Sequence, residues 1–454
     1  MLTGLVTRQG ARVKCKSLIM GVIIILAIAF MGLGNLIFNV LLINFFILFI
    51  YVMYKPKNIF HPNNIVFAFS FLYVVVPSSL QLIYEVLDLP YLLPWGKLYD
   101  WFSYELSTYY SVFFLYLVLY FSFYFFNQKD LPPRKVTYIV DVNILSALFV
   151  FTVLMLFLYM NLTGGFVSWF TSYKQTFLLG RDGLGLFNFV MLFSVNLLVF
   201  LLGLYFHRKR RLLKFSILLI SLLLIVFASL LQGLKSRVII LLIIFFFPYL
   251  LQLRLKISIL FLLGILFFII LYIGNYIRTD GFYDTPLVFI EYMMTYFNVY
   301  ELHNMVTIQS DPGFFNTLHH VFVKPLAALG VVSQDAEYDI SVMLTKEYFP
   351  LDWKSMRATQ QWPLITELYY NYYGFVLGWL PLVIYAFVLT VLYKKTKSGN
   401  VALALIFILE FFRLFTAQRG VLIPWQMPIY LSFYIFIYFV VKKIVKVTSK
   451  ENYS

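Results

Sequence analysis

The sequence is poor in charge and has almost no cysteine. Only 12% of its 454 residues are charged, whereas 62% are hydrophobic and 20% are aromatic. An ordinary soluble domain carries about twice that share of charged residues, so this chain has too little polar surface to face water on all sides. Its composition therefore excludes a soluble globular enzyme. The single cysteine, Cys15, excludes a disulfide framework and a cysteine-based metal site.

Histidines with metal-ligand spacing are also missing. His303 stands alone, and His319 and His320 are adjacent, which points their side chains apart in a helix or a strand. The sequence has no H-x-x-x-H or H-E-x-x-H pattern, so histidine spacing does not predict a metal site. A loop histidine could act as a general base, because it titrates near neutral pH, or could simply form hydrogen bonds.

Long apolar runs fill most of the chain. A transmembrane helix needs about 20 mostly apolar residues, and breaks at charged or Pro/Gly/Asn clusters predict twelve spans. A basic segment before the first run resembles the start of a signal peptide, but the apolar stretch continues from Leu18 to Tyr54 without a small-residue cleavage site, which favours an uncleaved first hairpin. The predicted spans are Leu18–Leu33, Leu36–Tyr54, Asn64–Tyr84, Leu106–Phe126, Val142–Met160, Leu186–Phe206, Phe215–Leu234, Val238–Leu253, Ile257–Tyr276, Leu364–Tyr393, Val401–Ala417 and Pro424–Val441.

The net charge of +15 is distributed unevenly over the connections between these spans. With the N-terminus in the cytoplasm, the cytoplasmic segments hold 23 of the 35 basic residues and a net charge of about +20. The opposite side carries about −5. This asymmetry predicts that both termini are cytoplasmic. It also explains the basic cluster from His207 to Arg211 as a topology signal near anionic lipid, so the positive charge does not predict a nucleic-acid partner.

Three outer connections of the single integral membrane domain, residues 1–454, are more than short turns: a moderate one from Glu85 to Glu105, rich in proline and aromatic residues, and two others. Residues 161–185 form the smaller outer loop and include Tyr173 and Arg181. Residues 277–363 form the large loop, between the ninth and tenth spans, and hold ten acidic residues and three of the five histidines. Loops of that length usually have a role in a compact protein. Asp335, Glu337 and Asp339 in this loop either bind a cation or solvate the loop.

Several basic side chains lie at the outer ends of spans, where lysine and arginine are disfavoured. They are Lys235, Arg237, Arg278, Arg357 and Arg419. The planar guanidinium suits bidentate phosphate recognition, so a cluster of them indicates a diphosphate or an acidic glycan at the membrane surface. The alternative is that each side chain extends to lipid headgroups or pairs with a loop carboxylate.

Two other polar groups lie on predicted spans. Glu410 and Arg413 are three residues apart and so share a helix face, which favours an internal ion pair over an arginine lining a substrate cavity. At the start of the tenth span, Glu367 and Asn371 lie one turn apart among tyrosines, a combination of hydrogen-bonding groups and rings that suits a sugar. Gly374 and Gly378 on the same span are explained by close helix packing.

The sequence resembles one known family, the O-antigen and oligosaccharide repeat-unit polymerases (Wzy). The resemblance rests on the twelve spans, the outer loop after the fifth span, the long loop between the ninth and tenth, and three short motifs. These motifs are Gly233-Leu-Lys-Ser-Arg237, Glu367-Leu-Tyr-Tyr-Asn-Tyr-Tyr-Gly374 with Gly378, and Gln418-Arg-Gly420. The resemblance extends from about Gly164 to the end of the chain.

The resemblance implies an all-α polytopic protein of the bacterial inner membrane with a GT-C-like glycosyltransferase architecture and a periplasmic active site. Its activity would be polymerisation of undecaprenyl-diphosphate-linked oligosaccharide repeat units, without a metal or other cofactor. The implied partners are the lipid-linked oligosaccharide, the lipid bilayer, and also a chain-length regulator and a flippase. Two rival functions remain open: a lipid-linked oligosaccharide flippase, and an O-antigen ligase, which shares the fold and type of chemistry.

The resemblance also implies roles for individual residues. Arg237 and Arg419 are the best motif matches and are expected to contact the diphosphate, together with Lys235. Arg278 and Arg357 flank the large loop, and Arg181 lies in the smaller one with Tyr173. We expect these three arginines, Tyr173 and Asn371 to bind the substrate. Glu367, His319 and His320 are the candidates for the catalytic base that accepts the proton of the attacking hydroxyl.

Overall fold

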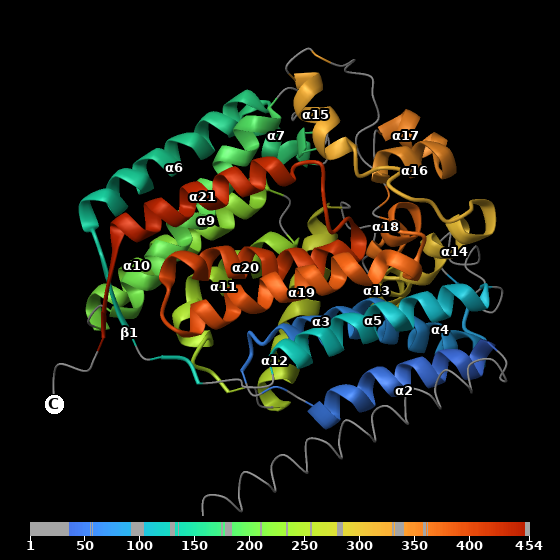
Figure 1. Cartoon of the computed structure of the whole chain (residues 1–454). Coiled ribbons are helices and arrows are strands. Elements are labelled where there is room, and N and C mark those ends of the chain that lie inside the picture. The colour runs from blue at the N-terminus through green and yellow to red at the C-terminus, as the bar shows by residue number, and fades with distance from the viewer. Residues whose placement is uncertain are drawn as a thin grey trace, which may run out of the picture.

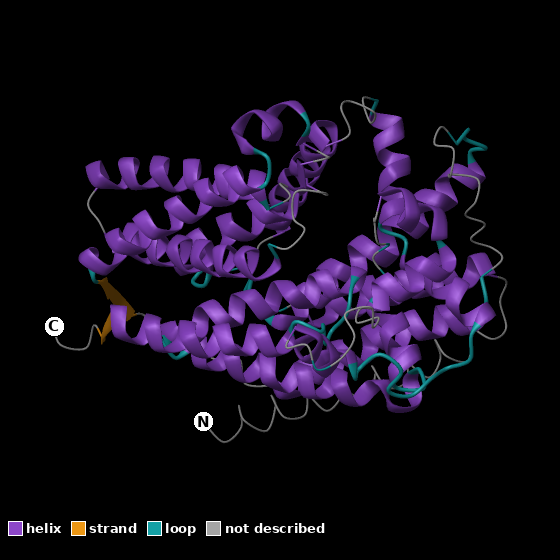
Figure 2. Ribbon diagram, turned by 90° about the horizontal axis from the view of Figure 1, so that it is seen from above, coloured by secondary structure: helices purple, strands orange, loops and turns teal. Residues whose placement is uncertain are grey.

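The computed structural model shows a bundle of roughly parallel helices with a small sheet at one end (Figures 1 and 2). It describes residues 36–54, 56, 58–91, 104–127, 132–134, 136–173, 176–177, 184–208, 211–232, 235–254, 257–278, 285–328, 331, 340–356, 360 and 362–449. Helices α14, α16, α17 and α18 lie at the end opposite the sheet, and we call this the α18 end (Figure 1).

Helices account for most of the described chain. They are α2 (Leu36–Tyr54), α3 (Pro62–Ser70), η1 (Phe71–Val75), α4 (Val76–Val86), α5 (Leu106–Phe126), α6 (Val142–Leu162), α7 (Gly165–Thr171), α9 (Gly185–Arg208), α10 (Arg211–Leu231), α11 (Lys235–Leu250), α12 (Ile257–Arg278), α13 (Pro286–Tyr296), α14 (Val299–Gln309), α15 (His320–Ala328), α16 (Ile340–Tyr348), α17 (Pro350–Met356), α18 (Leu364–Asn371), α19 (Phe375–Lys397), α20 (Val401–Thr416), η4 (Ala417–Arg419) and α21 (Met427–Ile444). The strands are β1 (Val136–Val140) and β2 (Val445–Ser449).

The helices confirm a membrane-embedded, predominantly helical protein. Within the described residues, seven are long and apolar enough to cross a membrane. Their outward faces carry large apolar side chains, such as Leu154 on α6, Leu223 on α10 and Phe439 on α21, each more than 60% exposed. Such surfaces require lipid around them. Eleven of the twelve predicted apolar segments are helical, and the first, Leu18–Leu33, lies outside the described residues.

The tenth predicted span, Leu364–Tyr393, is not one continuous helix, so this prediction is wrong. It breaks between α18 and α19, where Tyr373 and Gly374 both have positive φ, 49° and 61°. A positive φ ends the helical hydrogen-bond series and turns the chain. Gly378 then packs against the side chain of Leu368, because a Cβ at Gly378 would lie only 3.3 Å from it. Glu367 therefore lies on a short helix outside the span that follows.

The two-stranded sheet was not expected from the sequence. β1 pairs with β2 in antiparallel register, with Val136 opposite Ser449 and Val140 opposite Val445. The backbone N–H of Arg134 also donates to the carbonyl of Lys397 at 2.8 Å. Three segments predicted to be cytoplasmic therefore meet at the sheet end, as they would if they lay on one side of a membrane (Figure 1).

The large loop, residues 277–363, is largely helical where it is described. α14 joins the bundle through the side chain of Asn304, whose Oδ1 accepts hydrogen bonds from the Glu105 N–H at 2.8 Å and the Thr108 hydroxyl at 3.1 Å. Tyr300 and His303 on the same helix are fully buried. Residues predicted to form an outer loop thus cover one end of the bundle and contribute to its interior.

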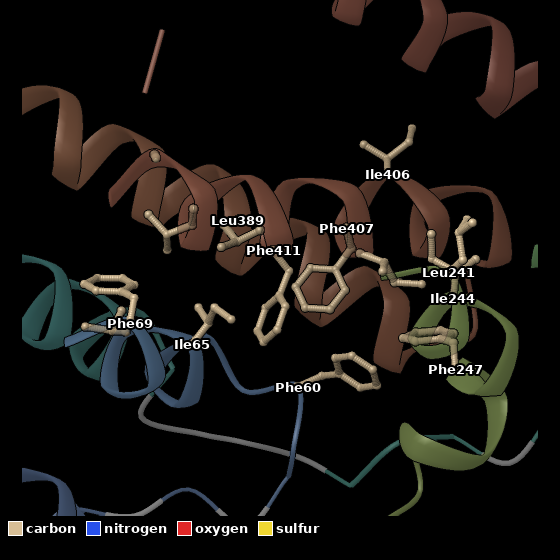
Figure 3. Packing of buried hydrophobic residues seen from close by; sticks show 14 of the residues in the cluster. Phe60, Ile65, Phe69, Leu241, Ile244, Phe247, Leu389, Ile406, Phe407 and Phe411 are labelled. Carbon is tan, nitrogen blue, oxygen red and sulfur yellow. The ribbon is translucent and has the colours of Figure 1, made fainter. Parts of the chain in front are cut away.

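The core of the bundle is rich in aromatic side chains. Phe60, which precedes α3, packs against Phe247 of α11 with ring centroids 5.0 Å apart and against Phe411 of α20 at 5.7 Å (Figure 3). Phe60 is 3% exposed. Edge-to-face and tilted pairs of this kind are favourable arrangements for aromatic rings, and here they join three segments that are far apart in the sequence.

Gly203 allows α9 and α11 to approach closely, and its replacement tests this contact. A Cβ at Gly203 would lie 2.1 Å from the carbonyl oxygen of Phe245, so Gly203→Ala must push the two helices apart. We expect a loss of about 1–3 kcal/mol of stability, measured as a lower Tm in detergent. The matched control is Gly264→Ala on α12, where a Cβ meets nothing within 4 Å. Equal Tm values for the two variants would contradict the close contact.

Candidate active site

Arg237 provides the first component of a polar cluster inside the bundle. It lies in the first turn of α11, and its side chain is partly buried between α9 and the end of α10. Its Nη2 donates to Oδ1 of Asn196 at 2.6 Å and to the carbonyl of Leu192 at 3.4 Å. Its Nε donates to Oε1 of Gln232. Asn196 is eleven residues into α9, about 16 Å along its axis, so the guanidinium lies well inside the bundle.

The partners of Arg237 leave its charge uncompensated. Two side-chain amides and one carbonyl hold the guanidinium, and within the described residues none of its hydrogen-bond partners is a carboxylate. A partly buried charge without a counter-ion is costly. The same environment attracts an anion that can reach the exposed part of the side chain. Arg237 therefore has the properties of an anion-binding group.

Glu410 and Arg413 on α20 form the second component. Nη2 of Arg413 lies 2.6 Å from Oε2 of Glu410, which confirms the predicted internal ion pair. The hydroxyl of Tyr434 donates to Oε1 of Glu410, and the hydroxyl of Tyr385 lies 3.1 Å from Oε2. Arg413 also donates to the sulfur of Met427 at 3.2 Å. The ion pair is thus buried, and further hydrogen bonds satisfy its remaining polar atoms. A buried ion pair is stable only under this condition.

Tyr430 connects the two components. It lies in the first turn of α21 and interacts electrostatically with both Arg413 and Arg237. Its ring packs against those of Phe189 and Phe193 on α9, at 5.6 and 5.7 Å. Because α9 also carries the Asn196 partner of Arg237, helices α9, α11, α20 and α21 meet around the two arginines.

Glu367 forms the third component, at the beginning of α18. Its carboxylate accepts hydrogen bonds from the backbone N–H groups of Leu422 and Ile423, the latter at 3.3 Å. These residues directly follow the Gln418-Arg-Gly420 motif. Glu367 also interacts electrostatically with Arg413. The structure therefore brings two of the sequence motifs together, although 50 residues separate them in the chain.

The environment of Glu367 holds its pKa near neutrality. Burial raises the pKa of this carboxyl to about 7, while the two backbone N–H groups and the positive charge of Arg413 act in the opposite direction. A carboxyl with a pKa near the operating pH can both accept and release a proton, which is the property expected of a general base or acid. The burial that shifts the pKa is a product of the fold.

His303, one of the three histidines of the large loop, is buried against the start of α18. Its Nδ1 lies 3.4 Å from the hydroxyl of Thr366, the residue before Glu367. Burial lowers the pKa of His303 to about 3, so it is neutral at physiological pH. Its Nε2 has no hydrogen-bond partner among the residues that the structure describes. His303 thus contacts the start of α18 at Thr366 as a neutral polar group.

The predicted histidine pair lies at the other end of α18. Asn371 accepts a hydrogen bond from the Thr317 N–H at 2.8 Å and donates to its hydroxyl at 2.8 Å. This places His319 and His320 near the C-terminal end of α18, whereas Glu367 lies near its start. His319 is exposed and His320 is buried, with their rings 4.2 Å apart. The amide of Asn371, predicted to bind substrate, is used here to hold the chain at Thr317.

The remaining predicted residues are placed only in part. The hydroxyl of Tyr173 donates to the carbonyl of Leu230 at 3.2 Å, two residues before Gln232, which brings the smaller loop toward the turn that precedes Arg237. Lys235, Arg278 and Arg419 lie on described helices, but their side chains are outside the described part. Arg181 and Arg357, and the acids Asp335, Glu337 and Asp339, lie outside the described residues.

Several members of the cluster were missed at the level of sequence. Asn196 and Gln232 bind Arg237, and Tyr385, Tyr430 and Tyr434 surround the ion pair. An asparagine in the middle of an apolar span was a usable signal, because polar groups within spans usually have partners. The tyrosines carried no such signal in a chain that has 35 of them.

The buried Glu410–Arg413 ion pair allows a prediction of how removing one partner changes the stability of the protein. Arg413→Met leaves the Glu410 carboxylate buried without its counter-ion, which we expect to cost about 3–5 kcal/mol. The double variant Glu410→Gln/Arg413→Met removes both charges and should recover most of the lost Tm. Thermal unfolding in detergent measures both. An Arg413→Met protein as stable as the parent, yet inactive, would show that Arg413 serves the substrate and not the fold.

Comparisons with known proteins do not extend these observations. The chain matches no family model, no curated protein and no solved structure. Within the described residues, no group of three or more His, Cys, Asp or Glu side chains is placed to hold a metal ion. The class that the fold and site define is a helical membrane protein with an internal polar cluster of two arginines, Arg237 and Arg413, and two carboxyls, Glu367 and Glu410.

Proposed function

We propose that this protein is a polymerase of lipid-linked oligosaccharide repeat units, similar to the O-antigen polymerases, with twelve spans and a GT-C-like architecture. The observation that carries the proposal is the guanidinium of Arg237, which is partly buried among neutral partners. A lipid-linked diphosphate is an anion that reaches such a group from the membrane. The second support is Glu367, a carboxyl whose pKa is raised to about 7, in the same cluster.

The proposed reaction is a glycosyl transfer between two lipid-linked substrates. The hydroxyl oxygen of the acceptor unit attacks the anomeric carbon of the growing chain, and the bond from that carbon to the phosphate oxygen breaks. The proton of the hydroxyl moves to Glu367, and the electron pair leaves with the undecaprenyl diphosphate. Arg237, and Arg419 and Lys235 by their motif positions, stabilise the negative charge that develops on the diphosphate.

The proposed topology places this chemistry on the periplasmic side of a bacterial inner membrane. The basic segments that meet at the sheet end would then be cytoplasmic, and the α18 end would be periplasmic. A chain-length regulator and the flippase that delivers the repeat units are the expected protein partners. No residue of the site requires a cofactor in this reaction.

Glycan analysis after gene deletion tests the proposal against its two rivals. Loss of a polymerase leaves single repeat units attached to the acceptor lipid, loss of a ligase leaves none attached, and loss of a flippase strands the units on the cytoplasmic side. The purified protein in vesicles, given the lipid-linked repeat unit extracted from the producing cells, should form a ladder of longer glycans. A deletion strain with normal long-chain glycan would overturn the proposal.

A further inference from the structure

An exposed group of three aromatic rings lies at the α18 end, and we call it the aromatic platform. It consists of Phe314, Phe315 and Tyr373, which are 52%, 48% and 47% exposed. The rings of Phe314 and Tyr373 are parallel within 2°, with centroids 5.6 Å apart, and the ring of Phe315 lies 6.2 Å from that of Phe314. The platform joins the large loop to the break between α18 and α19.

The backbone beneath the platform is strained and firmly held. Phe315 has φ 58° and Tyr373 has φ 49°, in the left-handed region that bulky residues rarely adopt. Hydrogen bonds hold both segments: the Phe315 N–H donates to the carbonyl of Asn371 at 3.0 Å, and the Tyr373 N–H to the carbonyl of Gly313 at 2.8 Å. Glycine would relieve the strain at either position. Aromatic residues at both positions therefore indicate that the rings themselves have a function.

The surroundings of the platform favour a sugar over a lipid chain. Asp311 and Asn316 flank Phe314 and Phe315 in the sequence, and both are exposed. A carboxylate is costly in hydrocarbon, whereas carboxylate and amide groups hydrogen-bond well to hydroxyls. The face of an aromatic ring carries partial negative charge, which attracts the slightly positive C–H hydrogens on the face of a pyranose. Rings, a carboxylate and an amide together match the chemistry of a glycan.

The platform is also connected to the candidate active site. Phe314 pairs with Tyr372 through an isolated β-bridge. Burial raises the pKa of Tyr372 to about 12, with a smaller contribution from the carboxylate of Glu367. The platform thus adjoins the C-terminal end of α18, the helix whose first turn carries the carboxyl that we propose as the base.

We infer that the aromatic platform is a sugar-binding subsite on which a pyranose ring of the substrate glycan stacks, with Asp311 and Asn316 binding its hydroxyls. This inference rests on the proposed function, because it assigns part of the same site to the glycan. It replaces the earlier expectation that Asn371 contacts the sugar, since that amide is buried and bound to Thr317.

Photo-crosslinking identifies what covers the platform without assuming the reaction. Phe314 is replaced by p-benzoylphenylalanine, cells of the producing strain are irradiated, and the purified protein is analysed by mass spectrometry and by periodate staining. We expect a carbohydrate adduct. The control is the same substitution at Phe125 at the C-terminal end of α5, which is 68% exposed and lies toward the sheet end, where Lys394 donates to the carbonyl of its neighbour Phe126. Phospholipid or protein adducts alone at Phe314, or equal carbohydrate labelling at both positions, would overturn the inference.

Substitution by leucine separates ring stacking from general hydrophobicity. Phe314→Leu and Tyr373→Leu keep apolar surface but remove the ring, so the KM for the lipid-linked repeat unit should rise by about 2- to 12-fold each with kcat little changed. Phe125→Leu, at the sheet end of the bundle, should leave KM unchanged. Unchanged KM in both platform variants would refute the subsite. A carbohydrate adduct in a protein that forms no glycan ladder would keep the subsite and refute the polymerase, so the two failures are distinguishable.

Discussion

Arg237→Ala is expected to reduce glycan chain growth by about 10²- to 10³-fold, the typical effect of removing a group that stabilises developing negative charge. The reason is the position of its guanidinium, held by Asn196, Gln232 and the Leu192 carbonyl, with no carboxylate partner in the part of the chain that the structure describes. The measurement is the length distribution of glycans formed in vesicles from the extracted lipid-linked repeat unit. Membrane insertion and Tm of the variant are measured in parallel.

A sharper version of this experiment keeps the arginine and cancels its charge. Gln232→Glu is nearly isosteric and places a carboxylate beside the Arg237 guanidinium. Nε2 of Gln232 has no hydrogen-bond partner among the described residues, so the substitution removes no hydrogen bond that the structure shows. We expect a Tm equal to or above that of the parent protein, and a loss of chain growth of at least about 10-fold.

The matched control adds the same negative charge at the same end of the bundle without touching Arg237. Gln309→Glu, on the exposed last turn of α14, meets this requirement and should leave activity unchanged. If Gln232→Glu were fully active, Arg237 would not bind the substrate anion, and its role would be structural. If both variants lost activity equally, the effect would be one of surface charge.

Glu367→Gln is expected to reduce the rate by about 10²- to 10⁴-fold, the usual contribution of a general base. In the parent protein, the rate should fall as the pH drops below about 7, because burial raises the pKa of this carboxyl to about 7 and only the ionised form accepts a proton. The residual rate of Glu367→Gln should lack this dependence on pH. The control is Glu301→Gln, which removes another carboxyl, with a pKa raised by burial to about 8, and should keep the pH dependence of the parent.

The pH dependence of the free energy of unfolding provides a second, independent test of the raised pKa of Glu367. Its pKa is higher in the folded protein, about 7, than the ordinary value of 4.5, so the folded state holds the proton more tightly than the unfolded chain. The free energy of unfolding is therefore highest below about pH 4.5 and falls, by up to about 3 kcal/mol, as the pH rises through 7. In Glu367→Gln this contribution should disappear, leaving the decline due to Glu301, whose pKa burial raises to about 8. If the rate of the parent protein did not change with pH near 7 while its free energy of unfolding declined as expected, the role of Glu367 would be structural and not catalytic.

The candidate site could be predicted from the sequence only in its parts. Arg237, Glu367 and the Gln418-Arg-Gly420 motif stood out because charge is costly in an apolar chain, and the spacing of Glu410 and Arg413 predicted their ion pair. Their convergence was not predictable, because it depends on which helices are neighbours. The contact of Glu367 with Leu422 and Ile423 is of this kind. Burial is also a property of packing, and it is burial that raises the pKa of Glu367.

The aromatic platform and the sheet show the same limit. Phe314 and Tyr373 are ordinary members of a chain that is 20% aromatic, and only the hydrogen bonds between the turn at Gly313 and the end of α18 bring their rings together. The pairing of β1 with β2 joins residues about 300 positions apart. Neither strand has a hydrophobic pattern that identifies a partner, since short strands depend on long-range pairing.

The sequence by itself determined that the protein is helical and membrane-embedded, and where most of its long apolar helices begin and end. These properties follow from local hydrophobicity, because a run of about 20 apolar residues is stable in lipid wherever it lies in the chain. The tertiary structure alone decided that the tenth span breaks before α19, that Arg237 is held by two side-chain amides and a backbone carbonyl, and that Glu367 is buried and interacts with Arg413. Each of these depends on residues from different helices, because the free energy of a buried charge depends on everything packed around it.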